Sequence, residues 1–238
     1  MDEHRNYLGQ PLGAPLPGWA PRPLPPRTAM TGRFCTVEPL DRERHAAQIF
    51  AAYAEDVEGR MWTYLPRGPY ASLAEYHEWA KAACRSDDPL VHAIVDHATG
   101  EAIGTASYMR IDPPSGVIEI GSITYSPRLQ RRPAGTEAMY LMMRRVFDEL
   151  GYRRYEWKCN SLNAPSRAAA LRYGFQYEGL FRQAQVTRGR NRDTTWFSII
   201  DSEWPALRAA FERWLDPANL DAAGQQRRSL ASFRPPSA

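Results

Sequence analysis

Apolar residues follow two different periods on either side of one loop near the middle of the chain. Residues 117–125, VIEIGSITY, are mostly β-branched, aromatic or small and stop at Ser126-Pro127, which predicts a strand. After the loop, apolar residues recur at three- and four-residue spacing, at Ala138, Leu141, Met142, Val146 and Leu150. This spacing predicts an amphipathic helix over 136–150, with Thr136 as N-cap and Gly151 just past its end.

The same reasoning predicts the other elements. Strands are expected at 33–39, 90–96, 102–111, 154–159, 175–186 and 194–201, and helices at 45–54, 72–83, 166–173 and 203–215. Ser72 and Glu75 form a capping box, while 60–70 is rich in Pro, Gly and aromatic residues and predicts a shaped loop. Short turns join three strands between 90 and 125 into an antiparallel meander, and the helical connection makes 154–159 parallel to 117–125.

These elements predict a single α/β (α+β) domain over 33–215. Its sheet is expected to be mixed, mostly antiparallel and twisted, with about seven strands flanked by helices. Seven prolines between residues 11 and 26 predict an extended arm over 1–32. The arm could lie across its own domain or across the partner in a homodimer, with Trp19 as an anchor. Residues 216–238 are polar and predict a flexible tail.

Composition excludes several classes of protein. The chain has 238 residues and a net charge of +3, with basic residues spread among 27 acidic ones, so nucleic-acid binding is not indicated. It contains no apolar run of about 18 residues and no secretory leader, so neither a membrane span nor export is predicted, and we expect a cytoplasmic protein. Three cysteines form no CxxC pair and no metal-ligand spacing, which fits reduced thiols and no metal site.

The loop between the central strand and helix contains Gln130-Arg131-Arg132-Pro133-Ala134-Gly135. A loop that opens a helix directs backbone N–H groups and the positive end of the helix dipole toward one point, where a phosphate binds well. Gly135 allows close approach of the backbone, whereas Pro133 removes one N–H donor. The alternative is an ordinary connection with solvated arginines.

Two motifs in order resemble the GNAT superfamily of acetyl-CoA-dependent N-acetyltransferases. The pyrophosphate loop of that family has the pattern Q/R-x-x-G-x-G/A, here Gln130-x-x-Pro133-x-Gly135, with Pro133 in place of the first glycine. The second signature, N-x-x-S followed by GF-x-x-EG, is present as Asn163 to Ser166 and Gly174 to Gly179. The pattern is closest to the branch that contains ribosomal-protein alanine N-acetyltransferases, and it covers roughly 33–215.

The resemblance implies a binding site for acetyl-CoA. The strands 117–125 and 154–159 would splay apart, and the pantetheine arm would insert between them. The central strand's backbone would bond the pantetheine and polarise the thioester carbonyl. The loop would hold the pyrophosphate, and two residues of the second signature would meet the cofactor from the other side. The predicted cofactor residues are Ile123, Thr124, Tyr125, Gln130, Arg131, Arg132, Pro133, Ala134, Gly135, Thr136, Asn163 and Ser166.

The implied reaction is direct attack of a neutral amine on the thioester, which requires a base. Glu119 on the central strand is the candidate, because a carboxylate beside an apolar cleft can have a raised pKa. An exposed strand glutamate facing a cation is the alternative, and His92 and Glu178 are weaker candidates. Many relatives carry a general-acid Tyr four residues before the GF glycine, where this chain has Ala170. Tyr173 could pack instead, and Cys159 is expected to be buried rather than an acyl carrier.

By resemblance, the first two helices and the loop 60–70 form one wall of the acceptor site, so Trp62, Tyr64 and Tyr70 are candidates to line it. Covering the core is the alternative for each. The loop 188–193 would lie at the mouth, where Arg190 or Arg192 could bind a carboxylate and Asp193 an amine. We therefore expect an N-acetyltransferase acting on a protein N-terminus or a small amine. The alternatives are a non-catalytic acetyl-CoA-binding module and, third, a nucleic-acid-binding module.

Overall fold

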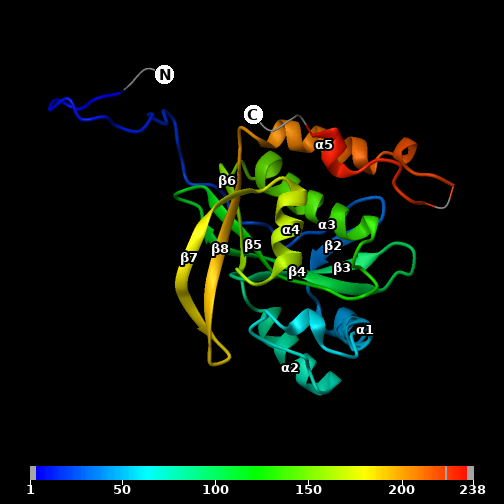
Figure 1. Ribbon diagram of the computed structural model, residues 1–238. Helices are drawn as coiled ribbons and strands as arrows, with labels where there is room; N and C mark the ends of the chain where they lie inside the picture. The colour runs from blue at the N-terminus through cyan, green and yellow to red at the C-terminus, as the bar shows by residue number, and fades with distance from the viewer. Residues whose placement is uncertain (1–3, 223, 235–238) are drawn as a thin grey trace.

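The computed structural model describes residues 4–222 and 224–234, and its centre is a twisted eight-stranded sheet (Figure 1). The strands run β1-β2-β3-β4-β5-β6-β8-β7 across the sheet, and all neighbours are antiparallel except β5 and β6. Their bounds are β1 Met30–Thr31, β2 Cys35–Pro39, β3 Leu90–Asp96, β4 Ala102–Asp112, β5 Val117–Tyr125, β6 Arg154–Asn160, β7 Gln176–Thr187 and β8 Arg190–Ile200. The predicted mixed sheet is confirmed, and β1 adds a short edge strand.

Helices cover both faces of the sheet. The α-helices are α1 Arg42–Ala54, α2 Leu73–Ala83, α3 Pro133–Arg144, α4 Ala164–Tyr173 and α5 Trp204–Leu215. A π-helical turn, η2 Arg145–Glu149, extends α3, and short 3₁₀ helices lie at η1 Arg60–Trp62, η3 Pro217–Asn219 and η4 Leu230–Phe233. One core packs α3 and α5 on the sheet, and a smaller core lies under α1 and α2 on the opposite face (Figure 1).

The helix α3 begins three residues earlier than predicted. Arg132 occupies the N-cap position and Pro133 the first helical turn, whereas Thr136 is buried inside the helix, so the prediction of Thr136 as N-cap is wrong. The physical reason is Pro133. Its fixed φ suits the first turn of a helix, and its missing N–H would have no intrahelical acceptor there.

The parallel pair β5–β6 separates part way along its length. Their register runs from Val117 opposite Arg154 to Ile120 opposite Trp157 and then ends. Residues 121–125 of β5 therefore have no partner strand on the β6 side, while β6 stays paired to β8 as far as Asn160. The resemblance predicted this opening between the two strands.

The segments outside the predicted domain pack against it in part. Trp19 donates from its indole N–H to the carbonyl of Pro114 at 2.9 Å, and the Arg145 guanidinium donates to the carbonyl of Thr28 at 2.6 Å. Residues 19–31 thus lie across the domain, while residues 4–18 project away from it (Figure 1). At the other end, Leu230 is only 1% exposed and η4 packs against α5, so this segment is docked on the domain, unlike the flexible tail predicted there.

Candidate active site

The loop before α3 is shaped to receive an anion. Arg131 adopts a left-handed conformation with φ of 59°, and the side chains of Arg131 and Arg132 are exposed. Among the described residues, the backbone N–H groups of Arg131 and Ala134 have no hydrogen-bond partner. Two free donors, two guanidinium groups and the positive end of α3 meet at this loop. These residues fit a pyrophosphate although Pro133 supplies no donor.

Gly135 is required by packing as well as by any ligand. A Cβ at this position would lie 3.0 Å from Cε2 of Tyr125 and 3.1 Å from the carbonyl oxygen of Leu129. The Tyr125 hydroxyl also donates to the Gly135 carbonyl at 2.9 Å. The loop, the central strand and the first turn of α3 are therefore locked together, so a bulky residue at 135 would disturb the fold and the cradle at once.

Part of the predicted backbone site on β5 is engaged within the domain. The Thr124 carbonyl accepts from the Tyr53 hydroxyl at 3.1 Å, and the Tyr125 carbonyl accepts from Nε2 of Gln130 at 2.8 Å. Ser122 has φ of 49° at a bulge where β5 and β4 slip in register, which places Ile123 in the bulge. Gln130 therefore holds the end of the strand, and Tyr53 is a contact that sequence reasoning missed.

Asn163, Ser166 and Thr136 have structural partners. Asn163 is the N-cap of α4, and its Oδ1 accepts from the Ser166 N–H at 3.1 Å. The Ser166 hydroxyl accepts from the Trp157 indole N–H at 3.0 Å, and the Thr136 hydroxyl accepts from Arg172 at 3.0 Å. The N-x-x-S signature thus starts a helix and ties it to β6, and the predicted contacts of these side chains with the cofactor stay predictions.

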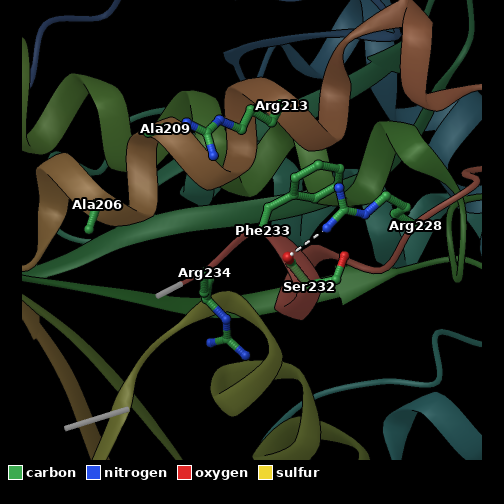
Figure 2. Close-up of a pocket in the computed structure, with 7 residues that line it drawn as sticks. All are labelled: Ala206, Ala209, Arg213, Arg228, Ser232, Phe233 and Arg234. Atoms are coloured by element: carbon green, nitrogen blue, oxygen red, sulfur yellow. Dashed lines mark hydrogen bonds between the residues drawn. The ribbon is translucent and has the colours of Figure 1, made fainter. Parts of the chain in front are cut away.

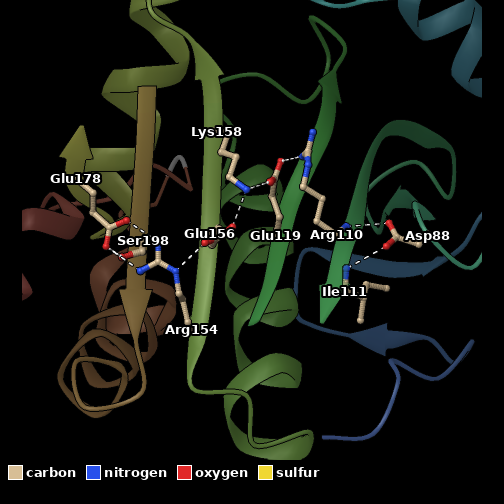
Figure 3. A network of polar contacts seen from close by, with 9 residues as sticks. All are labelled: Asp88, Arg110, Ile111, Glu119, Arg154, Glu156, Lys158, Glu178 and Ser198. Carbon is tan, nitrogen blue, oxygen red and sulfur yellow. Dashed lines mark hydrogen bonds and ion pairs between the residues drawn. The ribbon is translucent and has the colours of Figure 1, made fainter. Parts of the chain in front are cut away.

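Glu119 lies at the centre of an ion-pair network beside the opening of the sheet (Figure 3). It is 3% exposed, and its carboxylate lies 2.6 Å from the Arg110 guanidinium and 2.8 Å from Nζ of Lys158. Lys158 also contacts Glu156 at 2.7 Å, and Arg154 bridges Glu156 and Glu178. Burial raises the pKa of the Glu119 carboxyl above its ordinary value, against the opposing effect of Lys158 and Arg110.

Sequence reasoning missed the cations of this network. Lys158 and Glu156 interrupt the apolar pattern of β6 at alternate positions, and this is the signal that could have placed them on one face with Glu119. Arg110 is held in a left-handed conformation because Asp88 accepts from the N–H groups of Arg110 and Ile111 (Figure 3). The alternative of an exposed Glu119 facing a cation is wrong about exposure, because the side chain is buried, but Glu119 does face cations from both neighbouring strands.

The other candidate acids and bases are placed elsewhere or are engaged. His92 is fully buried on the α3 face beside Tyr108, and burial lowers its pKa to about 3. Hydrogen bonding to Arg154 lowers the pKa of Glu178. Tyr173 packs against Trp157 and Phe211, with its pKa raised by burial. Ala170 is buried, and Cys159 is buried with Sγ 3.2 Å from the Thr195 hydroxyl oxygen.

The aromatic loop forms a wall whose rings mostly face inward. Trp62 is 3% exposed and packs edge-on against Tyr53 and Tyr70, and a Cβ on Gly68 would lie 2.2 Å from its ring. Trp62 therefore covers the core, which was the alternative given for it, and does not line the acceptor site. Tyr70 is half-buried, and burial raises the pKa of its hydroxyl to about 12. Tyr64 is also half-buried.

The β7–β8 hairpin reaches the same wall. At its tip, the Arg188 guanidinium donates to the carbonyl of Gly68, which joins the hairpin to the aromatic loop. Arg190 is exposed at the tip. Asp193 instead holds a bulge in β7, since its carboxylate accepts from the N–H of Gln183 at 2.6 Å and from Asn191 at 3.0 Å. The geometry thus gives Asp193 a structural role, whereas Arg192, one residue earlier on β8, is close enough to Glu119 for their charges to interact.

A separate cavity of about 490 Å³ lies between α5 and the C-terminal segment (Figure 2). Its basic lining residues are Arg213, Arg228 and Arg234. Arg234 donates to the Leu171 carbonyl at 2.9 Å, and Arg228 stacks over Phe233. The described residues contain no cluster of His, Cys, Asp or Glu suited to a metal ion, and none of their helices is both long and apolar enough for a membrane crossing.

A parallel strand pair that opens beside a helix start with free N–H groups is the arrangement expected of a GNAT acetyltransferase. The acetyltransferase (GNAT) domain family matches residues 35–176 of this chain. The chain therefore belongs to the GNAT family of acetyl-CoA-dependent N-acetyltransferases, as its motifs indicated.

Similar proteins are consistent with this assignment. The crystal structure of a GCN5-related N-acetyltransferase from Brucella melitensis is 52% identical, with a TM-score of 0.90 over 92% of this chain and 99% of that one. An uncharacterised N-acetyltransferase, p20 of Bacillus licheniformis, is 30% identical over 47% of this chain and 62% of its own length. The ribosomal L7/L12 α-N-protein acetyltransferase RimL, in complex with coenzyme A, shares the fold at 19% identity over 73% of this chain and 99% of that one, with a TM-score of 0.62.

Proposed function

We propose that this chain transfers the acetyl group of acetyl-CoA to a primary amine, either a protein N-terminus or a small amine, by direct attack of the amine on the thioester. The observation that carries the proposal is a buried carboxylate, Glu119, one residue before the point where β5 and β6 separate. The cradle at 130–135 would hold the pyrophosphate through the free N–H groups of Arg131 and Ala134, and the opening would admit the pantetheine arm.

Glu119 is proposed as the base. An ammonium group has no lone pair, so it must lose a proton before its nitrogen can attack the carbonyl carbon. Burial raises the pKa of Glu119, which makes the carboxylate a better proton acceptor near neutral pH. Arg110 and Lys158 then hold the carboxyl oxygens in place and limit that rise. The C–N bond forms, the C–S bond breaks, and the second proton lost by the nitrogen can pass to the sulfur.

The chain has no tyrosine at the position where many relatives carry the general acid. Ala170 stands at the usual position, and burial raises the pKa values of Tyr125 and Tyr173. A thiol with a pKa of about 8.5 leaves readily as the anion. We therefore propose that the thiolate leaves without a protein acid and takes its proton from water or from the attacking nitrogen, which sheds its second proton as it becomes an amide.

A thiol-release assay tests this function. We expect release of coenzyme A that depends on an added amine and matches the amide formed. Acetyl-CoA at about 100 times its dissociation constant should also stabilise the protein by about 2.7 kcal/mol.

The ion pairs around Glu119 favour a second candidate, a non-catalytic acetyl-CoA-binding module, because a carboxylate held by two cations can be purely structural. Saturable thermal stabilisation by acetyl-CoA without release across peptides and small amines would support that candidate and contradict catalysis.

A further inference from the structure

One face of β8 presents three buried polar atoms that have no hydrogen-bond partner in the described chain: Nε of Arg192, Oγ1 of Thr194 and Nε1 of Trp196. Alternate residues of a strand point to the same face. The pairing of β8 with β6 is regular from Thr194 to Ile200, and the register shift opposite Arg192 and Thr194 adds its extra residues to β7 rather than to β8. Nζ of Lys158 lies 3.7 Å from the centre of the Trp196 ring and 2.8 Å from Glu119, which places the row on the face of Glu119.

The row is rich in donors. An indole and a guanidinium only donate hydrogen bonds, and a threonine hydroxyl can donate as well. Buried donors without acceptors are destabilising, so such a row is usually completed by a ligand or by water. A ligand group that matches several donors has several acceptor oxygens and no hydrogen-bond donor.

Charge points to the same kind of group. Arg192 is half-buried, and no carboxylate lies within ion-pair distance of it in the described residues. The titratable groups that influence it are Glu119, Arg110 and Cys159, and the carboxylate of Glu119 is already shared by Arg110 and Lys158. Burial lowers the pKa of the Arg192 guanidinium, yet arginine stays charged. A positive charge without an ion-pair partner among the described residues therefore lies near Glu119, the proposed base.

We propose that Arg192, Thr194 and Trp196 form an anion subsite of the acceptor pocket, and that the acceptor is a primary amine bearing a carboxylate. This inference rests on the proposed function. The planar guanidinium suits a carboxylate because it can donate two parallel hydrogen bonds. The carboxylate can belong to a free amino acid or to an acidic side chain next to a peptide N-terminus.

The test compares acceptors that differ only in this group. The first pair is 4-aminobutyrate and 4-aminobutanamide, and the second is seryl-glutamyl-alaninamide and seryl-glutaminyl-alaninamide. We expect kcat/KM to favour the carboxylate at least about tenfold in one pair, which identifies the source. Arg192→Gln should remove the preference and leave the affinity for coenzyme A and the melting temperature unchanged. Arg213→Gln is the control, because it removes the same charge from α5 on the opposite face.

Three results would overturn the inference: equal turnover of acid and amide by the wild type, a preference that persists in Arg192→Gln, or weaker coenzyme A binding by Arg192→Gln. The last result would assign the guanidinium to the cofactor phosphates. If no amine is acetylated, the proposed function fails. The anion subsite is then tested by binding alone, through calorimetric titration of both pairs into the coenzyme A complex. Binding that favours the carboxylate and is lost in Arg192→Gln supports the subsite, and equal binding refutes it.

Discussion

Replacement of Glu119 by Gln separates catalysis from structure, since Glu156 offers a matched control. The two carboxylates lie opposite each other on β5 and β6, both are largely buried, and both contact Lys158. Loss of one partner of a buried ion pair costs about 3–5 kcal/mol. In Glu119→Gln, Lys158 still contacts Glu156, and in Glu156→Gln it still contacts Glu119. We therefore expect each variant to lose less unfolding free energy, about 1–3 kcal/mol, and the two losses to be similar.

Their catalytic effects should differ. A general base contributes roughly 10²–10⁴ in rate, so Glu119→Gln should lower kcat by about that factor, while Glu156→Gln should stay within a few-fold of wild type. Because the pKa of Glu119 is raised, kcat should increase with pH around a midpoint above the pKa of an ordinary glutamate. This increase of kcat with pH should be absent from Glu119→Gln. Amine-dependent thiol release across pH measures both. Equal loss of kcat in the two variants, or an unchanged pH limb in Glu119→Gln, would refute the role of Glu119 as base.

Three further predictions concern the cradle, the aromatic loop and the edge of the network. Arg131→Gly should weaken coenzyme A binding roughly tenfold without loss of stability, because glycine accepts the φ of 59° and the side chain that is removed is exposed. Unchanged affinity in a calorimetric titration would contradict contact of the Arg131 guanidinium with phosphate. Gly68→Ala should lower the free energy of unfolding in urea by about 2 kcal/mol or more, because φ is 69° and the new Cβ would lie 2.2 Å from the Trp62 ring. The control Gly100→Ala, with φ of 72° and nothing within 4 Å, should lower it by about 1 kcal/mol. Similar losses in the two variants would contradict the packing of Gly68 against Trp62. The pKa of Glu178 is lowered in the folded protein, so its ion pair stabilises the fold above the ordinary pKa of a glutamate, and this contribution is lost as pH falls through the folded-state pKa. Glu178→Gln should therefore lower the melting temperature at neutral pH by an amount that shrinks in acid. A difference that does not shrink would refute the pairing with Arg154.

Strand patterns and helix caps in the sequence predicted several elements of the fold correctly. The strand predicted at 117–125 matches β5 in full, and Ser72 caps α2 as expected, with its hydroxyl accepting from the Glu75 N–H at 3.2 Å. The start of α3 was misplaced because the apolar period begins at Ala138, while the backbone turns helical at Pro133. The short strand β1 and the docking of residues 19–31 depend on tertiary contacts with distant residues such as Arg145, which local patterns do not encode.

The candidate site was predicted less completely. The order of motifs predicted the cradle, and a place on the central strand made Glu119 the candidate base; both lie beside the opening between β5 and β6. Sequence spacing could not show that Arg110 and Lys158 converge on Glu119, because they come from strands on either side of it. Nor could it show that Asp193 is engaged by a bulge in β7 at Gln183, because that bulge depends on the pairing of two strands.

Transfer of an isotopically labelled acetyl group tests the central claim most directly. The protein is mixed with labelled acetyl-CoA, first alone and then with an amine that supports thiol release, and both protein and products are weighed by mass spectrometry. Direct attack predicts that the protein alone stays unlabelled, and that all of the label released appears on the amine nitrogen with one coenzyme A for each amide. Label retained on the protein, on Cys159 for example, or coenzyme A released without an acetylated amine, would contradict the account.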